Sequence, residues 1–249
     1  MKQPKPNLFC IPYAGGVAKL IYNGWREFLG HQMNIIPMEL AGHGSRMKDP
    51  FYYNIKEAVS DLFTIAENYL NGDPYAVYAH SMGTIMAYEL VLKIEKQGLN
   101  PPSAVFLSGR YTPDYRYQKD NIYLMNDEDF LAEVYKIGGI SREMLDYPEL
   151  IKYFLPILRN DYAITQEYTM SEFRKLNTDI IFLYSDQDSY LPDIEAARQW
   201  QRFSAGQFKL YEFQGGHFFI NEQKKEVCRV IHENICSVNA LAACNQTTG

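Results

Sequence analysis

The sequence of 249 residues has few basic residues, few cysteines and no long apolar run, and each shortage excludes a class of protein. Its 24 lysine and arginine residues are outnumbered by 30 aspartate and glutamate residues, for a formal net charge of −6. This balance lacks the basic surface that binds nucleic acid, so we expect no nucleic-acid partner. The acidic excess mainly favours solubility.

Cysteine and histidine are sparse and show no metal-ligand spacing. The cysteines form no CxxC pair, and no two histidines have the spacing of a metal site, so we predict no metal. Cys10 lies in an apolar run and is expected to be a buried thiol. Cysteine usage of this kind favours a reducing, cytoplasmic location. The four cysteines are Cys10, Cys228, Cys236 and Cys244.

The sequence also lacks segments that would direct the chain into or across a membrane. Proline and glycine interrupt the N-terminal apolar stretch too early for a signal peptide. No run approaches the roughly 20 apolar residues of a membrane span, so we expect no membrane association.

What the sequence does contain is an alternation of apolar runs with amphipathic segments. Such alternation predicts an α/β fold with a mostly parallel sheet covered by helices on both faces. The length suits a single domain over residues 1–249, with a hydrophobic content of 47% to form its core. The predicted strands are 7–13, 34–40, 75–80, 103–109, 178–185 and 207–213. The predicted helices are 17–29, 54–70, 82–97, 192–202 and 219–235.

One long segment breaks this alternation. Between Arg110 and Asn177 no run has the character of a core strand, and its pieces fit short helices better. The segment is too long for a bare loop in a compact domain. We therefore interpret about 111–177 as a helical insertion over one edge of the sheet. The small, polar tail at about 237–249 is expected to fray.

The segment Ala79-His80-Ser81-Met82-Gly83 is one residue away from the G-x-S-x-G pattern of a nucleophile elbow. In such an elbow a tight strand–turn–helix exposes the serine hydroxyl and directs the following amide, here of Met82, at the developing oxyanion. Small residues are needed on both sides because strand and helix nearly touch, and Ala79 adds one methyl group. The alternative is a serine that only caps the helix.

Acidic and histidine partners follow Ser81 in the order of a serine hydrolase. Asp186 and Asp188 follow the strand at 178–185, and His217 follows the last strand in a glycine-containing loop. Open α/β sheets place their sites beyond the carboxyl ends of strands. His217 would take the proton of Ser81, and the aspartate would orient the imidazole. The alternative for His217 is a loop histidine in contact with water.

Two glycine-containing loops complete the candidate site. The loop at 11–16 follows the first strand, and we predict that its Ala14 amide, or alternatively that of Tyr13, is the second oxyanion donor. The alternative is a simple tight turn with Gly15 and Gly16 at positive φ. The other loop, "AGHGSR", contains His43, which ranks below His217 because it precedes the serine and follows no matching acid.

Seven segments occur in the same order as in a known family. They are "FCIPYAGG", "ELAGHGSR", "YAHSMGTIMAYEL", "AVFLSGRYTP", "LPILRNDY", "SDQDSYLP" and "FQGGHFFI". Over about residues 7–235 the chain resembles the type II thioesterases of nonribosomal peptide and polyketide assembly lines. The resemblance implies an α/β-hydrolase fold with a helical lid, which matches the insertion at 111–177. It also implies hydrolysis of acyl or aminoacyl thioesters from the phosphopantetheine arm of carrier domains, without a metal or a cofactor.

The resemblance implies a role for each triad candidate. Ser81 is the nucleophile, His217 the base and Asp188 the acid, which usually stands fourth in a G-x-x-D run. Ser185 occupies the glycine position of that run here, and Asp186 is the reserve candidate. The chain departs from the family's pattern at two positions: Ala79 replaces the elbow glycine, and His43 stands where an arginine is common.

The lid should set selectivity and lie near the carrier contact. We expect a monomer that makes a weak, largely apolar contact with acyl- or peptidyl-carrier domains, helped by Arg110, Arg116 or Lys119. The competing functions are a carboxylesterase, a medium-chain acyl-carrier-protein hydrolase and a non-catalytic carrier-binding protein. The candidate substrate-binding residues are Tyr13, Tyr111, Phe130, Tyr135 and Phe154; the alternative for each lid residue among them is packing of the lid onto the body.

Overall fold

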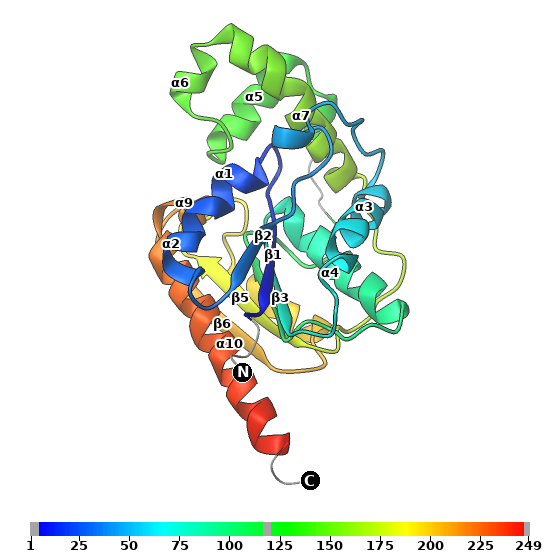
Figure 1. Ribbon diagram of the computed structural model, residues 1–249. Helices are drawn as coiled ribbons and strands as arrows, with labels where there is room; N and C mark the ends of the chain where they lie inside the picture. The colour runs from blue at the N-terminus through cyan, green and yellow to red at the C-terminus, as the bar shows by residue number, and fades with distance from the viewer. Residues whose placement is uncertain (1–4, 117–120, 247–249) are drawn as a thin grey trace.

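The computed structural model describes residues 5–116 and 121–246, with side chains as far as Ile235. Its centre is a sheet of six parallel strands in the order β2-β1-β3-β4-β5-β6 (Figure 1). This confirms the predicted α/β class. The strands are β1 (Asn7–Ile11), β2 (Asn34–Pro37), β3 (Tyr75–His80), β4 (Ala104–Ser108), β5 (Asp179–Ser185) and β6 (Phe208–Phe213).

Helices cover both faces of the sheet, which is why its central strands are continuous apolar runs. Val77 and Ala79 of β3 face one cluster, whereas Ala76 and Tyr78 face the other. The first face carries α3 (Ile55–Glu67), α4 (Met82–Lys96) and α8 (Ile194–Arg198), which the 3₁₀-helix η4 (Gln199–Phe203) extends. The second carries α1 (Ala18–Tyr22), α2 (Arg26–Leu29), α9 (Phe219–Glu222) and α10 (Lys224–Gln246).

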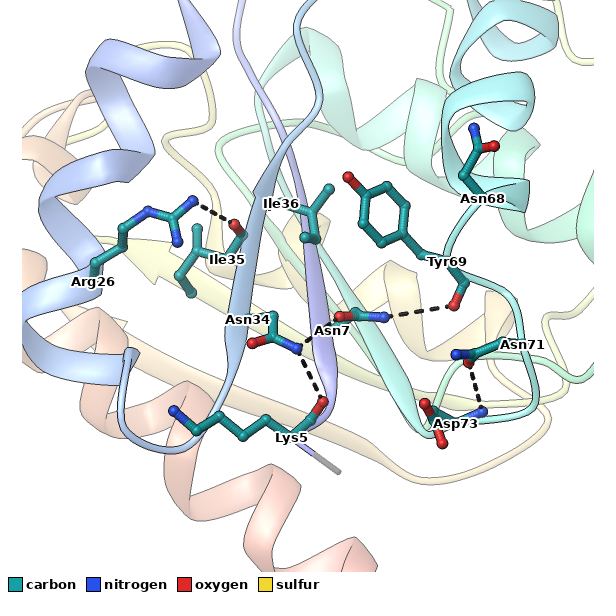
Figure 2. Close-up of a pocket in the computed structure, with 10 residues that line it drawn as sticks. All are labelled: Lys5, Asn7, Arg26, Asn34, Ile35, Ile36, Asn68, Tyr69, Asn71 and Asp73. Atoms are coloured by element: carbon teal, nitrogen blue, oxygen red, sulfur yellow. Dashed lines mark hydrogen bonds between the residues drawn. The ribbon is translucent and has the colours of Figure 1, made fainter. Parts of the chain in front are cut away.

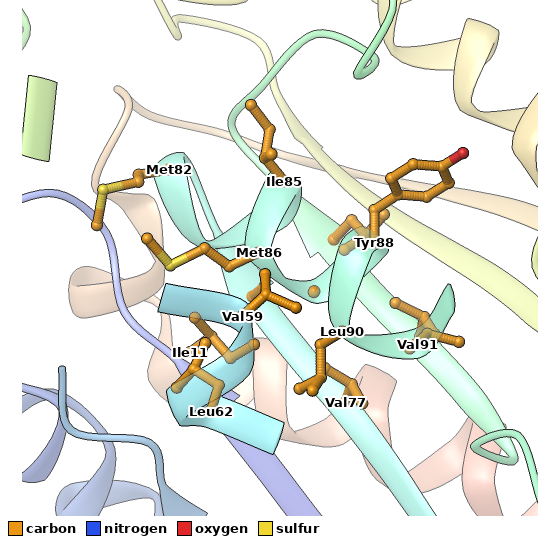
Figure 3. Close-up of a cluster of buried hydrophobic side chains, with 14 of the residues drawn as sticks. Ile11, Val59, Leu62, Val77, Met82, Ile85, Met86, Tyr88, Leu90 and Val91 are labelled. Carbon is orange, nitrogen blue, oxygen red and sulfur yellow. The ribbon is translucent and has the colours of Figure 1, made fainter. Parts of the chain in front are cut away.

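The first cluster anchors α4, whose N-terminus follows Ser81. Met82 and Met86 of α4 pack with Leu62 of α3 and Ile11 of β1, all at most 1% exposed (Figure 3). Burying each such side chain contributes about 1.5–3 kcal/mol relative to leaving it in water. The start of α4 is therefore held firmly against the end of β1.

Between β4 and β5 lies the helical segment predicted at about 111–177. It comprises η3 (Ile122–Leu124), α5 (Asp127–Lys136), α6 (Arg142–Leu145) and α7 (Pro148–Gln166). These helices gather at one end of the molecule, beyond the strand ends that lead into α1 and α4 (Figure 1). Phe130, Val134, Ile140 and Leu158 form a small core within the segment. Its helical character agrees with the prediction, and its function as a lid stays a prediction.

Two helical regions differ from the expectation. The stretch at 17–29 is divided by a 3₁₀ turn, η1 (Asn23–Trp25), since asparagine and glycine are poor helix formers. The last helix, α10, continues past residue 235 to Gln246, so the tail expected to fray from about 237 is helical that far. Alanine and leucine in "NALAAC" favour this extension. Within the described residues no helix is long and apolar enough to cross a membrane.

Candidate active site

Ser81 joins β3 to α4 with φ +52° and ψ −121°, and it is the only non-glycine residue with positive φ among those the structure describes. Residues in such sparsely populated conformations cluster at functional sites. Ser81 makes no side-chain capping bond to α4, whereas Asn54 caps α3 by accepting from the Glu57 amide at 2.9 Å. Ser81 therefore stands at the N-cap position of α4, but its hydroxyl does not cap the helix.

The hydroxyl of Ser81 faces His217 instead. Its Oγ lies 3.0 Å from Nε2 of His217, and Nδ1 of the same ring lies 2.9 Å from Oδ2 of Asp188. A carboxylate only accepts, so Nδ1 carries the proton and Nε2 presents its lone pair to the serine. Both side chains of the His217–Asp188 pair are 2% exposed, which keeps competing water away. This is the contact pattern of a serine–histidine–aspartate triad.

The loop after β5 decides between the two aspartates. Asp188 Oδ1 also accepts from the amides of Tyr190 at 2.8 Å and Leu191 at 3.3 Å, which fix the carboxylate toward the histidine. Asp186 is exposed, and its Oδ1 accepts from the Gly215 amide at 3.0 Å. Asp188 is thus the carboxylate beside His217, while Asp186 ties the loop after β5 to the loop that carries His217.

The helix α4 begins against the end of β1, which brings the loop at 11–16 beside Ser81. A Cβ atom on Gly83 would lie 2.7 Å from the Pro12 carbonyl oxygen, so only glycine permits this approach. Among the described residues, neither the Ala14 nor the Met82 amide has a hydrogen-bond acceptor. A developing oxyanion needs two such amides beside the nucleophile, and the assignment of Met82 and Ala14 as its donors stays a prediction.

The turn that carries Ala14 runs from Tyr13 to Gly16. The Gly16 amide donates to the Tyr13 carbonyl at 2.9 Å, and Gly15 has φ +73°. The expectation of positive φ holds for Gly15 and is wrong for Gly16. The turn is bonded to the helical segment, because the Gly15 amide donates to Oδ2 of Asp161 on α7 at 2.7 Å.

His80 and Ala79 support the elbow from within the core. The His80 Nδ1 lies 2.8 Å from Ser108 Oγ, and its ring packs 4.8 Å from that of His217. Burial, and then the neighbouring His217, lower the pKa of His80 well below its usual value, so His80 is neutral. Ala79 is fully buried in the cluster of α3 and α4, which accommodates its methyl group.

The candidate substrate-binding aromatics are divided between the site and the interior of the helical segment. The Tyr13 ring packs edge-on against Phe218, next to His217. Phe130 is fully buried in the core of the helical segment, where Phe154 also packs, so both contribute to packing within the segment rather than between the segment and the body. Tyr111 stacks on Tyr115 with centroids 3.9 Å apart.

A cavity of about 400 Å³ lies between α4, the loop after β4 and the end of α7. Ile85, one turn after Ser81, lines it together with Arg110. Arg110 is only 5% exposed and donates to the hydroxyl of Tyr190 at 3.1 Å. The expectation that Arg110 helps a surface contact is therefore wrong; Arg116 is exposed, and Lys119 lies outside the described residues.

A second cavity, of about 450 Å³, lies at the opposite end of the sheet beside the start of β1 and β2 (Figure 2). Several of its polar side chains are hydrogen-bonded to other groups of the protein. Asn34 donates to Asn7 at 3.2 Å, and Arg26 donates to the Ile35 carbonyl at 2.8 Å. No group of histidine, cysteine and carboxylate side chains among the described residues could hold a metal ion.

His43 and Asp161 form another buried pair, with Nε2 of His43 2.9 Å from Oδ2 of Asp161. Sequence reasoning ranked His43 low and did not consider Asp161. The sequence signal that could have identified Asp161 is its place in "LPILRNDY", one of the seven segments that resemble the known family.

Comparisons with known proteins match nearly the whole chain. A family model of the thioesterase domain matches residues 6–235. The crystal structure of ClbQ from the colibactin NRPS/PKS pathway superposes with a TM-score of 0.90 at 30% identity, covering 96% of this chain and 100% of that one. The type II thioesterase BorB from the borrelidin biosynthetic cluster gives 0.83 at 29%, covering 92% of each. The medium-chain S-acyl fatty acid synthase thioesterase of Anas platyrhynchos is 26% identical, over 94% of this chain and 92% of its own.

Proposed function

The chain belongs to the thioesterase-domain family, and from this premise we propose that it is a type II thioesterase of an NRPS or PKS assembly line. It would hydrolyse acyl or aminoacyl thioesters from the phosphopantetheine arms of carrier proteins, releasing misprimed or stalled groups. The observation that carries this proposal is the run of contacts from Ser81 Oγ to His217 at 3.0 Å and from His217 to Asp188 at 2.9 Å.

The first half of the reaction acylates the enzyme. His217 Nε2 removes the hydroxyl proton of Ser81 as Oγ attacks the thioester carbonyl. The amides of Met82 and Ala14 donate to the oxyanion that forms on the carbonyl oxygen. The C–S bond then breaks, and the pantetheine thiol leaves with the proton held by His217. Because a thiolate is a good leaving group, protonation of the leaving group by a general acid contributes less here than in amide hydrolysis.

The second half releases the acid. Water enters where the thiol left, His217 removes its proton, and the hydroxide attacks the acyl carbonyl. The same two amides donate to the second oxyanion, and Ser81 leaves with the proton from His217. Asp188 keeps its hydrogen bond to Nδ1 throughout and stabilises the imidazolium in both halves. Neither half requires a metal or a cofactor.

The relatives favour carrier-bound substrates. ClbQ belongs to an NRPS/PKS pathway, and BorB is a type II thioesterase of a biosynthetic cluster. The Anas platyrhynchos relative, a medium-chain S-acyl fatty acid synthase thioesterase, supports a second candidate function, hydrolysis of medium-chain fatty acyl groups. Both candidates share the triad and differ in the acyl group and in the carrier.

A release assay with a panel of carrier domains tests the proposal. Each holo carrier is loaded with a short acyl, a medium-chain acyl or an aminoacyl group, and free acyl-cysteamine thioesters and short oxoesters serve as controls. We expect release of short acyl or aminoacyl groups from assembly-line carriers, and none by Ser81→Ala. Faster cleavage of short oxoesters would indicate a carboxylesterase, and preference for medium chains would indicate the fatty acyl hydrolase.

Binding measurements separate catalysis from simple carrier recognition. Ser81→Ala should retain its fold and its affinity for the holo carrier while losing turnover. Turnover by Ser81→Ala equal to that of wild type would remove Ser81 from the mechanism. Carrier binding without turnover by the wild type would indicate the non-catalytic carrier-binding protein.

A further inference from the structure

The turn that carries the Ala14 amide is held by a carboxylate from the helical segment. The Gly15 amide, one peptide after Ala14, donates to Oδ2 of Asp161 at 2.7 Å. Fixing the Gly15 N–H fixes the plane of the Ala14–Gly15 peptide, and the Ala14 N–H of the preceding peptide is joined to that plane through the two backbone dihedrals of Ala14. A Cβ on Gly15 would lie 2.5 Å from Leu158 Cδ2, so α7 also packs directly on the turn. The orientation of Ala14 therefore depends on α7.

The same carboxylate oxygen is bonded to His43. Nε2 of His43 lies 2.9 Å from Oδ2 of Asp161, and Nδ1 lies 2.9 Å from the carbonyl oxygen of Ala41. A carbonyl and a carboxylate both accept, so both ring nitrogens donate and the ring is an imidazolium. The side chains of His43 and Asp161 are each 1% exposed, and a buried carboxylate without its cation would be strongly destabilised.

We propose that His43 and Asp161 are positioning residues for the oxyanion hole: the Asp161 carboxylate holds the Gly15 amide, and the charge of His43 holds the carboxylate. The pair connects three segments that are far apart in sequence, namely the turn after β1, the loop after β2 and helix α7. Neither residue touches the reacting atoms in this scheme. The inference rests on the proposed function, because it assigns the Ala14 amide to the oxyanion.

A consequence is that the oxyanion hole is sensitive to a rise in pH above the usual pKa of histidine. Burial lowers the pKa of His43, but the Asp161 charge, its hydrogen bond, the Ala41 carbonyl and Glu39 together raise it above the usual value. The pairing is therefore complete below the usual pKa of histidine and is lost as the pH rises through the raised value.

The charged groups around His43 come from two elements. Asp161 belongs to α7, and Glu39 belongs to the segment after β2, where its Oε1 accepts from the Ala18 amide at 2.8 Å. Arg46, in the same loop as His43, is engaged by Asp61 and Asp49.

Four variants test the proposal. Asp161→Asn keeps the volume and an acceptor for Gly15 but removes the charge, and His43→Gln removes the cation. His43→Arg keeps a cation that does not titrate. Asn160→Ala is the matched control, because Asn160 lies next to Asp161 on α7 and donates to the Tyr52 carbonyl at 2.9 Å without reaching the turn.

The expected result is a loss in kcat rather than in KM. For an acyl-cysteamine thioester, Asp161→Asn and His43→Gln should lower kcat about 10- to 100-fold with KM within about threefold, as for a displaced oxyanion donor. Asn160→Ala should keep the wild-type kcat. His43→Arg should recover most of the loss seen in His43→Gln and should abolish the decline in wild-type kcat that accompanies deprotonation of His43.

A second readout keeps this test separate from the proposed function. A fluorophosphonate phosphonylates Ser81 with loss of fluoride, and its phosphoryl oxygen needs the same oxyanion donors. If the wild type hydrolyses no thioester, the substrate proposal fails, and slower phosphonylation of Asp161→Asn and His43→Gln still supports the positioning role. If both variants lose thermal stability but match the wild type in phosphonylation rate, kcat and pH profile, the pair is only structural and the inference is overturned.

Discussion

Among the residues that the structure describes, two buried histidine–aspartate pairs differ in what the second ring nitrogen of the histidine faces. His217 with Asp188 and His43 with Asp161 both have nitrogen–oxygen distances of 2.9 Å. Nε2 of His217 faces the Ser81 hydroxyl, which can donate, whereas Nδ1 of His43 faces a carbonyl, which only accepts. The first ring can be a neutral base, whereas the second carries a proton on both nitrogens until the pH rises through its raised pKa. The acid partner alone therefore does not define a catalytic histidine.

The largest effect is expected when the histidine of each pair is replaced in a separate variant and the two losses of kcat are compared. His217→Gln should lower kcat about 10⁴-fold or more, because it removes the base that contacts the Ser81 hydroxyl. His43→Gln should lower kcat by no more than about 100-fold, because it displaces one amide. Steady-state rates on one acyl-cysteamine thioester measure both. Equal losses would place His43 in the chemistry and contradict the distinction.

The next largest effect is expected from replacing Asp188, the aspartate that faces His217, and comparing the result with the same change at Asp186. Asp188→Asn should lower kcat about 10³- to 10⁴-fold, because the amide no longer holds His217 in the required tautomer. Asp186→Asn, at an exposed carboxylate, should stay within about threefold of the wild type. The ratio of the two kcat values is the measurement. A larger loss at Asp186 would reverse the assignment of the acid.

The turn from Tyr13 to Gly16 can be altered without replacing either histidine. Gly15→Ala should lower kcat about 10- to 100-fold, because the new methyl pushes against Leu158 and moves the Ala14 amide. Gly72→Ala is the control: Gly72 also has positive φ but has no atom within 4 Å of the new methyl. Both variants should lose stability in thermal unfolding, and only Gly15→Ala should lose kcat.

The smallest effect is expected at Ala79, which is buried two residues before Ser81. Ala79→Gly removes one buried methyl and should lower the free energy of unfolding by about 1 kcal/mol. It should leave kcat within about twofold, because Ala79 packs toward α3 and α4 rather than toward the oxyanion. Unfolding curves and kcat are measured on the same preparation. A change in kcat above tenfold would show that this methyl shifts the Met82 amide.

Much of the fold could be predicted because strands buried on both faces are recognisable as local apolar runs. The strand at 75–80 is observed with the predicted bounds, and the others differ at their ends by one to three residues. The break within 17–29 depended on local helix propensity and was not recognised. The small, polar composition of the tail predicts fraying, yet α10 continues to Gln246, so composition alone does not locate the end of this helix.

The sequence by itself determined the α/β class, the family and the order of Ser81, an aspartate and His217, because these depend on local patterns and on chain order. Only the tertiary structure decided that Asp188 rather than Asp186 faces His217, that Ser81 does not cap α4 and that Arg110 is buried. It also revealed the bond between His43 and Asp161, which are 118 residues apart. These results depend on which side chains from distant segments meet, and local sequence patterns do not encode that.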